Sequence, residues 1–564
     1  VNKTRVPKMS PLHHTLAILK DRIQNKDTGF TQAEREALGL DGRLPPKVET
    51  IQQQIARCEM QFFAIPKGIA QWLYLNRLQE TNETLYYAFV IRNLVACLPI
   101  VYTPVVGEAC SSYCQIWRSR PRGLYLNRSH LGKVASILDN WPYEARIIVA
   151  TDGTRILGLG DLGLGGHQIC VGKLSLYTLG GGFAPEHTLP ISFDFGCDKP
   201  EIRSSPYYLG LKEERNKGED FCNLINETIK AVRNKWPRCV FQFEDFSNDT
   251  AFRLLDRHRA DGPIFNDDIQ GTGCIAAAVV ASAIRAQSIR RGHTIKASDQ
   301  TWVMLGAGAG GIGVAERIAV LIEDEGFTPA EARKHFYLVD SKGLITTDRY
   351  DYVDGTMAEH KKPWAQEGLK NEDNKDLMTV IRHVKPTGLL GLSTIPGAFT
   401  TEMIHYVDDC HETSPIVLAL SNPTSKCEIH PQQAINACPG VFYGSGSPFP
   451  KSTMPDGSKL DTAQANNLYV FPGIGLGAYI CKAKQITDAM IIAVAKSIGT
   501  LVSDEDLARG HLLPPLTQIR EISRVAAMAL IRQAEKEGMA QEEMPSSDLQ
   551  LMELIRSYQW EPAY

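Results

Sequence analysis

The stretch TWVMLGAGAGGIG, residues 301–313, decides the fold of this sequence. Its opening apolar run is typical of a buried strand, and Gly306, Gly308 and Gly311 follow at once in the spacing G-x-G-x-x-G. A helical pattern, GVAERIAVLIEDEG, and a second strand pattern, HFYLVD, come next and end at Asp340. This order is typical of a dinucleotide-binding domain, because the glycines let the backbone approach a pyrophosphate at the helix N-terminus.

A second glycine pattern comes earlier in the chain, in ILGLGDLGLGG at residues 156–166. Spacing does not separate the two loops, since Gly158, Gly160 and Gly163 repeat the same motif between apolar segments. The earlier loop contains Asp161, which would place a carboxylate beside a diphosphate, and like charges repel in a poorly hydrated cleft. We therefore predict that the dinucleotide binds at the later loop.

Length and composition limit the class of protein. The chain has 564 residues, of which 43% are hydrophobic and 22% charged, with a formal net charge of −4. These values predict a globular protein of roughly three or four domains and give no sign of nucleic-acid binding. Apolar runs such as CIAAAVVASAI are shorter than the ~18–20 residues of a membrane span, so we expect no membrane association. The 13 cysteines lack CxxC spacing, which predicts reduced thiols.

Hydrophobic periodicity divides the chain into four predicted parts. Residues 1–120 form a helical N-terminal domain that ends in the turn-rich segment VYTPVVGEA. Alternating strand and helix patterns predict an α/β catalytic domain over 121–267 and 456–528, and a Rossmann-type domain over 268–455. A helical extension follows over 529–564. The predicted fold class is α/β, with two parallel-sheet domains and helical regions at both ends.

Acidic residues follow two aromatic strand patterns. Glu244 and Asp245 come after CVFQF, and Asp267 and Asp268 come after GPIF. Open α/β sheets bind ligands beyond the strand ends, and Mg²⁺ and Mn²⁺ prefer carboxylate oxygens. These positions suit a divalent-metal site, while helix caps and solvated loops are the alternative interpretation.

Lys173 lies beyond the earlier glycine loop, in CVGKLSLYTL. A single lysine is usually a solvated surface charge. Here the apolar neighbours would lower the pKa of the amine, which would allow it to act as a base near neutral pH. From the sequence pattern alone both interpretations stay open.

Many segments with chemical character occur in one particular order. They are PIVYTPVVGEAC, DGTRILGLGDLG, VGKLSLYT, FQFEDF, FNDDIQGTG, LGAGAGGIG, LSNPTSKCE, SGSPF and NNLYVFPG. In order and approximate spacing this set resembles the malic enzymes of eukaryotic type, over nearly the whole chain. The resemblance implies oxidative decarboxylation of L-malate to pyruvate and CO₂, with reduction of NAD(P) and a need for Mg²⁺ or Mn²⁺.

The resemblance also implies roles for individual residues. Tyr102 would be the general acid that protonates C3 of the enolpyruvate, and Lys173 the general base that takes the C2 hydroxyl proton. Asp267 matches the acid beside the metal site that interacts with the lysine. The implied metal ligands are Glu244, Asp245 and Asp268.

Substrate and cofactor contacts follow from the same resemblance. Arg155 matches the arginine that binds the carboxylate of malate, and Asn422 and Asn467 match asparagines at the substrate and the nicotinamide. The implied cofactor-binding residues are Arg155, Gly306, Gly308, Gly311, Asp340, Ser341, Lys342, Lys361 and Asn422.

The signals for cofactor preference conflict. Asp340 alone indicates NAD, because an acid at this position binds the ribose 2′-hydroxyl. In the resembling family, however, aspartate occurs with both preferences, and a later segment reads QEPF in NAD-preferring members but begins with lysine in NADP-preferring ones. Here it reads KKPW, with Lys361 and Lys362, and Lys342 adds a further cation. We predict NADP preference, with NAD preference and a merely charged surface loop as the alternatives.

Two departures from the family pattern stand out. The glycine loop lacks the glutamate of the GAGEAALG found in animal enzymes. Thr81 stands where fumarate-activated members carry arginine, so we do not expect fumarate activation by that route, although Arg57 keeps a nearby basic position.

Other classes of function are less well supported. A malate- or nucleotide-binding sensor need not retain Tyr102, Lys173 and the acids, and an oxaloacetate decarboxylase without redox chemistry need not retain the glycine loop. By resemblance we expect a homotetramer. We expect a cytoplasmic location, or the mitochondrial matrix if a presequence was removed.

Overall fold

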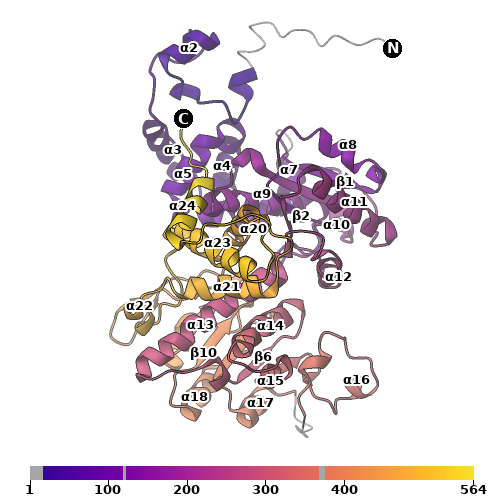
Figure 1. The fold of residues 1–564 in the computed structure, drawn as a ribbon, viewed down its shortest axis with the longest axis vertical. Helices are drawn as coiled ribbons and strands as arrows, with labels where there is room; N and C mark the ends of the chain where they lie inside the picture. The colour runs from indigo at the N-terminus through magenta and orange to yellow at the C-terminus, as the bar shows by residue number, and fades with distance from the viewer. Residues whose placement is uncertain (1–16, 119–121, 368–374) are drawn as a thin grey trace. The chain divides into compact units, whose positions relative to one another are not determined.

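The computed structural model describes residues 17–118, 122–367 and 375–564 (Figure 1). The chain folds into two compact units. Unit 1 comprises residues 1–156, 161–228 and 558–564, and unit 2 comprises residues 157–160 and 229–557. The predicted α/β class is confirmed, whereas the predicted four-part division of the chain stays a prediction.

The first part of unit 1 is helical, as the periodicity predicts. Thr31 and Thr50 cap the first two of the longer helices, since each side chain accepts the N–H of the third helical residue. The segment VVGEA, expected to be a turn, instead begins a helix, because Pro104 precedes it at a position where proline costs little. The elements are η1 (Asp27–Gly29), α2 (Gln32–Leu38), α3 (Ile51–Ala64), α4 (Ile69–Thr81), α5 (Glu83–Arg92), α6 (Leu94–Val101) and α7 (Val105–Ile116).

Three parallel strands form the sheet part of unit 1. Strand β3 (Thr188–Asp194) pairs in parallel with both β1 (Leu124–Asn127) and β2 (Ile147–Thr151). Every residue of β2 and β3 is buried, as is typical of strands with both faces covered. The other elements are η2 (Arg128–His130), α8 (Val134–Asp139), η3 (Gly163–Gly166), α9 (His167–Leu176), η4 (Tyr177–Gly181), η5 (Pro185–His187), α10 (Pro200–Arg203) and α11 (Glu219–Lys235), the last of which continues into unit 2.

The segment 558–564 packs against unit 1, although unit 2 precedes it in the chain. The indole of Trp560 lies edge-on to Tyr87 of α5, with ring centroids 5.7 Å apart. The Trp560 N–H donates to the carbonyl of Gly182 at 2.7 Å, just beyond η4. The Tyr564 hydroxyl is 2.7 Å from the Asn82 amide nitrogen.

Unit 2 begins with two parallel strands and a long helix. Strand β4 (Val240–Phe243) pairs with β5 (Ile264–Asn266), and α12 (Asn248–His258) connects them. The turn η6 (Asp267–Gly271) runs directly into α13 (Thr272–Arg291). Residues 267–291 are long and apolar enough to cross a membrane, contrary to the expectation from the apolar runs, but an 18-residue apolar stretch within this helix is 83% buried inside the protein. Such burial is typical of a helix in the core of a protein.

The largest sheet of unit 2 leads into the later glycine loop, which follows β6. Its strand order is β14-β11-β10-β9-β6-β7-β8, all parallel except β8, which pairs antiparallel with β7. The chain leaves β6 towards β7 and later returns to β9 on the other side of β6, so β6 and β9 mark the point where the strand order reverses. The strands are β6 (Trp302–Leu305), β7 (Phe336–Asp340), β8 (Gly343–Leu344), β9 (Gly388–Gly391), β10 (Ile416–Ala419), β11 (Phe442–Ser445) and β14 (Ala463–Gln464).

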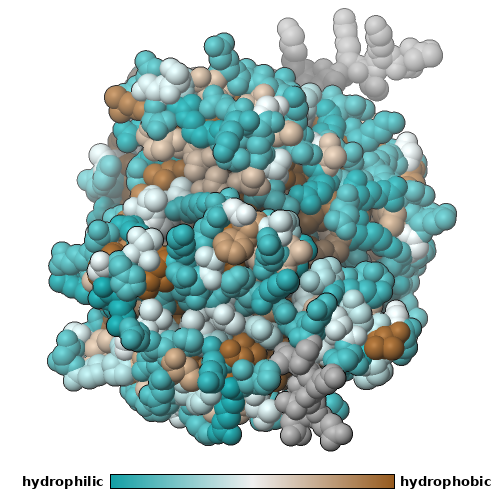
Figure 2. All heavy atoms as spheres, turned by 60° about the horizontal axis from the view of Figure 1, so that its bottom comes forward, coloured by the Kyte–Doolittle hydropathy of each residue, from teal (hydrophilic) through white to brown (hydrophobic). Residues whose placement is uncertain are grey.

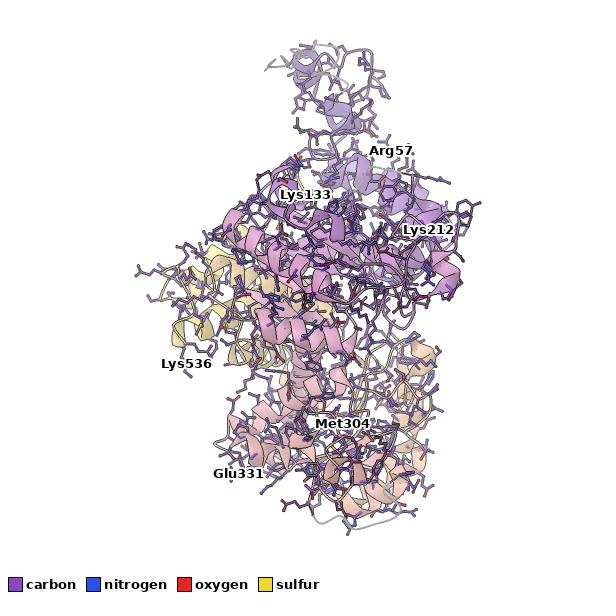
Figure 3. All side chains as sticks on the ribbon, turned by 90° about the vertical axis from the view of Figure 1, so that its right-hand side faces the viewer. Arg57, Lys133, Lys212, Met304, Glu331 and Lys536 are labelled. Carbon is purple, nitrogen blue, oxygen red and sulfur yellow. The ribbon has the colours of Figure 1, made fainter. Side chains whose placement is uncertain are left out.

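Helices connect the strands of this sheet, which is the predicted Rossmann-type arrangement (Figure 1). Figure 3 places Met304 of β6 among the side chains of this region and Glu331 of α15 at its surface. The elements are η7 (Ala297–Asp299), α14 (Ala309–Glu323), α15 (Pro329–Arg333), α16 (Tyr350–Val353), η8 (Lys362–Trp364), α17 (Leu377–Val384), α18 (Thr401–Cys410), η9 (Thr424–Lys426) and α19 (Pro431–Ala437).

The rest of unit 2 is mainly helical, as predicted. Helix α23 packs against both α20 and α21, and α13 packs against α21. The hairpin of β12 (Ser452–Thr453) and β13 (Lys459–Leu460) precedes these helices. They are η10 (Asn467–Tyr469), α20 (Phe471–Ile480), α21 (Asp488–Gly499), α22 (Asp504–Ala508), η11 (Leu516–Gln518), α23 (Ile519–Lys536) and α24 (Asp548–Tyr558).

Surface and cysteines agree with the composition. The face drawn in Figure 2 is mostly hydrophilic, with hydrophobic residues scattered over it. All 13 cysteines lie among the described residues, and none of them is paired in a disulfide in this structure.

Candidate functional site

A buried amine and a phenol meet in unit 1. Lys173 lies on α9, and Tyr102 directly follows the last residue of α6. The Lys173 Nζ donates a hydrogen bond of 2.8 Å to the Tyr102 hydroxyl, and only 1% of Lys173 and 8% of Tyr102 is exposed. Lys173 is therefore no solvated surface charge, and the pair has the geometry that proton transfer between two side chains requires.

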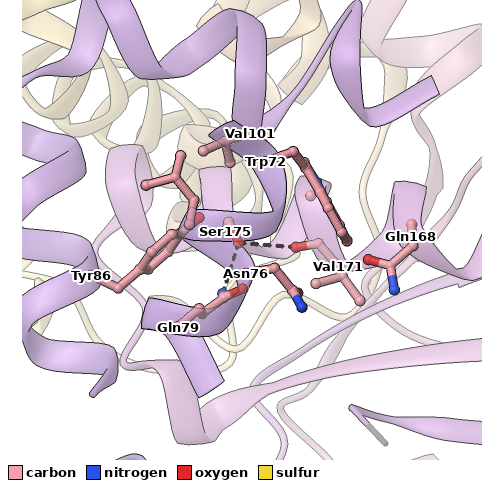
Figure 4. Close-up of a pocket in the computed structure, with 10 residues that line it drawn as sticks. Trp72, Asn76, Gln79, Tyr86, Val101, Gln168, Val171 and Ser175 are labelled. Carbon is pink, nitrogen blue, oxygen red and sulfur yellow. Dashed lines mark hydrogen bonds between the residues drawn. The ribbon is translucent and has the colours of Figure 1, made fainter. Parts of the chain in front are cut away.

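Unit 1 contains a pocket (Figure 4). The Gln79 amide donates to the Ser175 hydroxyl at 3.1 Å across it. Tyr102 and Lys173 do not line the pocket, although a neighbour of each does, so it is separate from the acid–base pair. The lining residues are Trp72, Leu75, Asn76, Gln79, Tyr86, Val101, Gln168, Val171, Gly172 and Ser175.

Three carboxylates gather in unit 2. Glu244 and Asp245 directly follow β4, and Asp268 lies in η6 directly beyond β5. One carboxylate oxygen of each lies within 4.8 Å of the others, and Glu244 and Asp245 are buried. The Asp245 N–H donates to Asp268 Oδ2 at 2.8 Å, and the Leu157 N–H to Asp245 Oδ2 at 3.3 Å. The parallel pairing of β4 and β5 thus brings together the acids that the sequence places after each strand.

Asp267 and Asn467 form a second contact near this cluster. The Asn467 amide donates to Asp267 Oδ2 at 2.8 Å, to the Asp267 carbonyl at 3.2 Å and to the Thr272 hydroxyl at 3.1 Å. Gly271 is required here, because a Cβ at this position would lie 2.1 Å from Asp267 Oδ1. Asn467 therefore fixes the side chain of Asp267, the residue that precedes Asp268.

The glycine loop after β6 has the geometry of a phosphate-binding turn. Gly306 has a φ of +108°, and Gly311 packs so closely that a Cβ would lie 2.1 Å from the Gly306 carbonyl oxygen. At Gly308, before α14, a Cβ would meet only the Asn248 side chain, at 3.9 Å. The three glycines thus provide the turn, the open approach for a ligand and the close packing of helix on strand.

The earlier glycine loop serves a different purpose, which its residue Asp161 shows. Arg215, 1% exposed at its side chain, donates to both carboxylate oxygens of Asp161, at 2.7 and 3.1 Å, and to the Asp152 carbonyl at 2.8 Å. Asp161 also accepts the Gly163 and Asp198 N–H groups. Burial raises the pKa of Asp161, but these hydrogen bonds outweigh burial and hold the pKa below its ordinary value. Asp161 thus stabilises its own loop by joining it to Arg215 and to the Asp198 backbone.

Replacing Arg215 with alanine should destabilise unit 1. Removing one partner of a buried ion pair leaves a buried charge and typically costs about 3–5 kcal/mol. Because the folded pKa of Asp161 is depressed, the stabilisation is present above its unfolded pKa and is lost as the pH falls through the folded pKa. Urea denaturation at neutral pH measures the loss. Arg128→Ala, which removes an exposed pair with Glu213, is the matched control, and an equal shift in both variants would contradict this account.

Cations surround Asp340 at the end of β7. Arg349 donates to both of its carboxylate oxygens, at 2.8 and 3.1 Å, and Lys361 Nζ lies 2.7 Å from Oδ2. Burial raises the pKa of Asp340, but the hydrogen bonds from Arg349 and Lys361 outweigh it and lower the pKa. The Lys342 side chain instead pairs with Asp351, at 3.0 Å. Sequence reasoning missed Arg349, since an arginine beyond β8 carries no recognisable motif.

The other predicted residues lie in loops or beside η8. Arg155 is an exposed residue of the loop after β2, and Ser341 is exposed in the turn between β7 and β8. Asn422 follows β10, and its side-chain oxygen accepts a hydrogen bond of 2.6 Å from the Ser447 hydroxyl. Lys362 pairs with Glu359 and does not contact Asp340. Thr81 donates to the Arg77 carbonyl at the end of α4.

The Rossmann-type sheet with its glycine loop is the architecture of a dinucleotide-binding protein. Two family models match the chain: "Malic enzyme, N-terminal domain" over residues 79–259 and "Malic enzyme, NAD binding domain" over residues 269–535. The chain therefore belongs to the malic enzyme family. The model of the NAD-binding domain contains the later glycine loop, as the sequence predicts.

Several proteins of this family are similar over nearly the full length. The NADP-dependent malic enzyme of Dictyostelium discoideum is 43% identical over 97% of this chain and 98% of its own. The mitochondrial 59 kDa isoform of the NAD-dependent malic enzyme of Solanum tuberosum is 39% identical, over 97% and 93%. The crystal structure of an Entamoeba histolytica malic enzyme shares the fold, with a TM-score of 0.55 and 21% identity over 82% of this chain and 80% of that one.

Proposed function

We propose that this chain oxidatively decarboxylates L-malate to pyruvate and CO₂, with a divalent metal and with NADP as the preferred acceptor. The buried hydrogen bond between Lys173 and Tyr102 carries the proposal, because malate oxidation needs a base and the following step needs an acid. The full-length similarity to NADP-dependent malic enzymes supports it.

Each proposed step uses a named side chain. Lys173 accepts the proton of the C2 hydroxyl as hydride leaves C2 for the nicotinamide, while Arg155 binds a carboxylate of malate. After CO₂ is lost, the Tyr102 phenol protonates C3. The proton held by Lys173 then returns to the phenolate along their 2.8 Å hydrogen bond, which restores both groups.

Glu244, Asp245 and Asp268 fit a divalent cation. Three carboxylates this close repel one another, and two of them are buried, so a cation between them relieves an unfavourable arrangement. Their donors are all oxygens, which Mg²⁺ and Mn²⁺ prefer. When bound there, the ion supplies a Lewis acid that polarises a carbonyl oxygen. Asp267, held by Asn467, is proposed to act beside these ligands.

The charges around Asp340 support NADP preference. Arg349 and Lys361 already occupy both carboxylate oxygens, so Asp340 is less available to accept a ribose 2′-hydroxyl. A 2′-phosphate brings close to two negative charges, which the same two cations can bind. Gly306, Gly308, Gly311, Ser341, Lys342 and Asn422 complete the proposed cofactor site.

Replacing Lys361 with glutamine should raise the Michaelis constant for NADP about five- to thirtyfold and leave that for NAD nearly unchanged. One partly screened contact between lysine and phosphate contributes on the order of 1–2 kcal/mol. Initial rates with each cofactor measure the effect. Lys362→Gln is the control, because Lys362 pairs with Glu359. Equal effects on both cofactors, or NAD used as efficiently as NADP by the unmodified protein, would refute NADP preference.

Assembly and location belong to the same proposal. Met60 and Phe63 of α3 are 72% and 56% exposed, which supports burial of this helix in a homo-oligomer, proposed to be a tetramer. We propose the cytoplasm as the compartment, with the mitochondrial matrix as the alternative that the Solanum tuberosum relative represents.

A spectrophotometric assay tests the proposal. The purified protein is given L-malate with NADP or NAD, with Mn²⁺ or with excess EDTA, and absorbance at the reduced nicotinamide band is followed. Reduction of NADP that requires Mn²⁺ is expected. Binding of malate without turnover would indicate a sensor, and consumption of oxaloacetate without any malate oxidation would indicate a simple decarboxylase.

A further inference from the structure

The loop after β9 lies where the Rossmann-type sheet reverses its strand order. The turn after β6 touches it, because a Cβ on Gly306 would lie 2.4 Å from the Leu392 carbonyl oxygen. Doubly wound sheets bind their ligands outside the strand ends at this reversal. Asp340, at the end of β7 on one side of β6, is placed for the adenosine ribose. The loop after β9, on the other side of β6, is therefore placed for the nicotinamide half.

Thr394 gives this loop a strained backbone. Its φ is +59°, in the left-handed region that β-branched residues rarely adopt. The side chain is exposed, so packing of the methyl and hydroxyl groups does not hold this conformation. The Thr394 N–H instead donates to the Ser421 hydroxyl at 2.8 Å. The conformation thus depends on a contact with the neighbouring loop, which follows β10.

Glu428 connects the two loops. It is fully buried, and its Oε1 accepts the Ser393 N–H and hydroxyl, both at 2.9 Å, and the Ser421 hydroxyl. Its Oε2 accepts the Ser421 N–H at 3.4 Å. The carboxylate packs against Gly391 at the end of β9, where a Cβ would lie 2.7 Å from the Glu428 side chain. The Ser421 hydroxyl thus donates a hydrogen bond to Glu428 and accepts another from the Thr394 N–H.

We propose that Glu428 is a positioning residue for the nicotinamide half of the dinucleotide, and that it acts by holding Thr394 in its left-handed conformation. The inference rests on the proposed dinucleotide-dependent function. Glu428 itself is fully buried, and we propose no direct contact between it and the cofactor. Its effect reaches the cofactor through the backbone of residues 392–394.

Glu428→Gln tests the proposal, because an amide offers two N–H groups where the carboxylate only accepts. We expect the dissociation constant of NADPH, measured by fluorescence titration, to rise about tenfold. Binding of Mn²⁺, measured by calorimetry, should stay unchanged. Glu402→Gln, at an exposed carboxylate of α18 paired with Arg382, is the matched control and should bind NADPH as the unmodified protein does.

A second substitution separates positioning from a merely structural role. Glycine adopts the left-handed conformation without steric cost, so the double variant Glu428→Gln with Thr394→Gly should regain most of the lost affinity, to within about threefold. Loss of fold stability alone would not be repaired in this way. If Glu428→Gln does not fold, Ser421→Ala removes the same connection and should weaken NADPH binding in the same direction.

The outcomes are distinct. Unchanged NADPH affinity in Glu428→Gln, or a double variant no better than the single one, overturns the role of Glu428 and leaves the proposed function intact. Failure of the unmodified protein to bind NADPH overturns the proposed function and this inference together.

Discussion

Lys173→Ala is expected to lower the rate of malate oxidation by about 10²–10⁴-fold, the usual contribution of a positioned acid or base. The amine is buried and donates to the Tyr102 hydroxyl, and alanine carries no group that can accept a proton. Tyr102→Phe should instead impair mainly the protonation of the enolate. Steady-state rates with L-malate, and separate assays with oxaloacetate, distinguish the two variants.

Ser175→Ala is the matched control for the lysine variant, because Ser175 is equally buried on the same helix. It should retain activity within a few-fold. Circular dichroism establishes that each variant is folded. A folded Lys173→Ala protein that turned over malate nearly as fast as the parent would rule out the proposed base.

Asp268→Ala should abolish oxidative decarboxylation and the binding of Mn²⁺. The substitution leaves two carboxylates, too few oxygen ligands for a tight divalent site. NADPH binding should persist, since Asp268 lies beyond β5 and the glycine loop lies beyond β6. Calorimetric titration with Mn²⁺ and fluorescence titration with NADPH measure the two effects.

Asp261→Ala removes a half-exposed carboxylate that pairs with His258, and it should affect neither titration. The metal assignment would be wrong if the unmodified protein kept full activity in excess EDTA. It would also be wrong if Asp268→Ala were fully active with Mn²⁺.

The sequence predicts features that depend on local order along the chain. Strand, glycines, helix and Asp340 follow one another within a single βαβ unit, so the sequence alone identifies the later glycine loop. The acids Glu244 and Asp268 are predictable for a similar reason, because each directly follows a strand and parallel strands end at the same edge.

Contacts between residues that are far apart in the sequence cannot be predicted from local order along the chain. Arg349 reaches Asp340 only because β8 turns the chain back along β7. Glu428 is a single acid in a polar segment, and nothing in that segment shows that two serines from separate loops converge on it. Strand β1 has only a short apolar pattern, and its pairing with β3 supplies the stability that this pattern does not indicate.

The packing of residues 558–564 on unit 1 bears on the timing of folding during synthesis. Trp560 contacts Tyr87 and the Gly182 carbonyl, yet the ribosome makes these partners long before the tryptophan. At typical elongation rates of about 5–20 residues per second, the intervening unit takes on the order of tens of seconds to emerge. During that interval Tyr87 and the turn after α9 have no tryptophan to cover them. The nascent first unit thus lacks the Trp560 contact with Tyr87 until residue 560 has been synthesised.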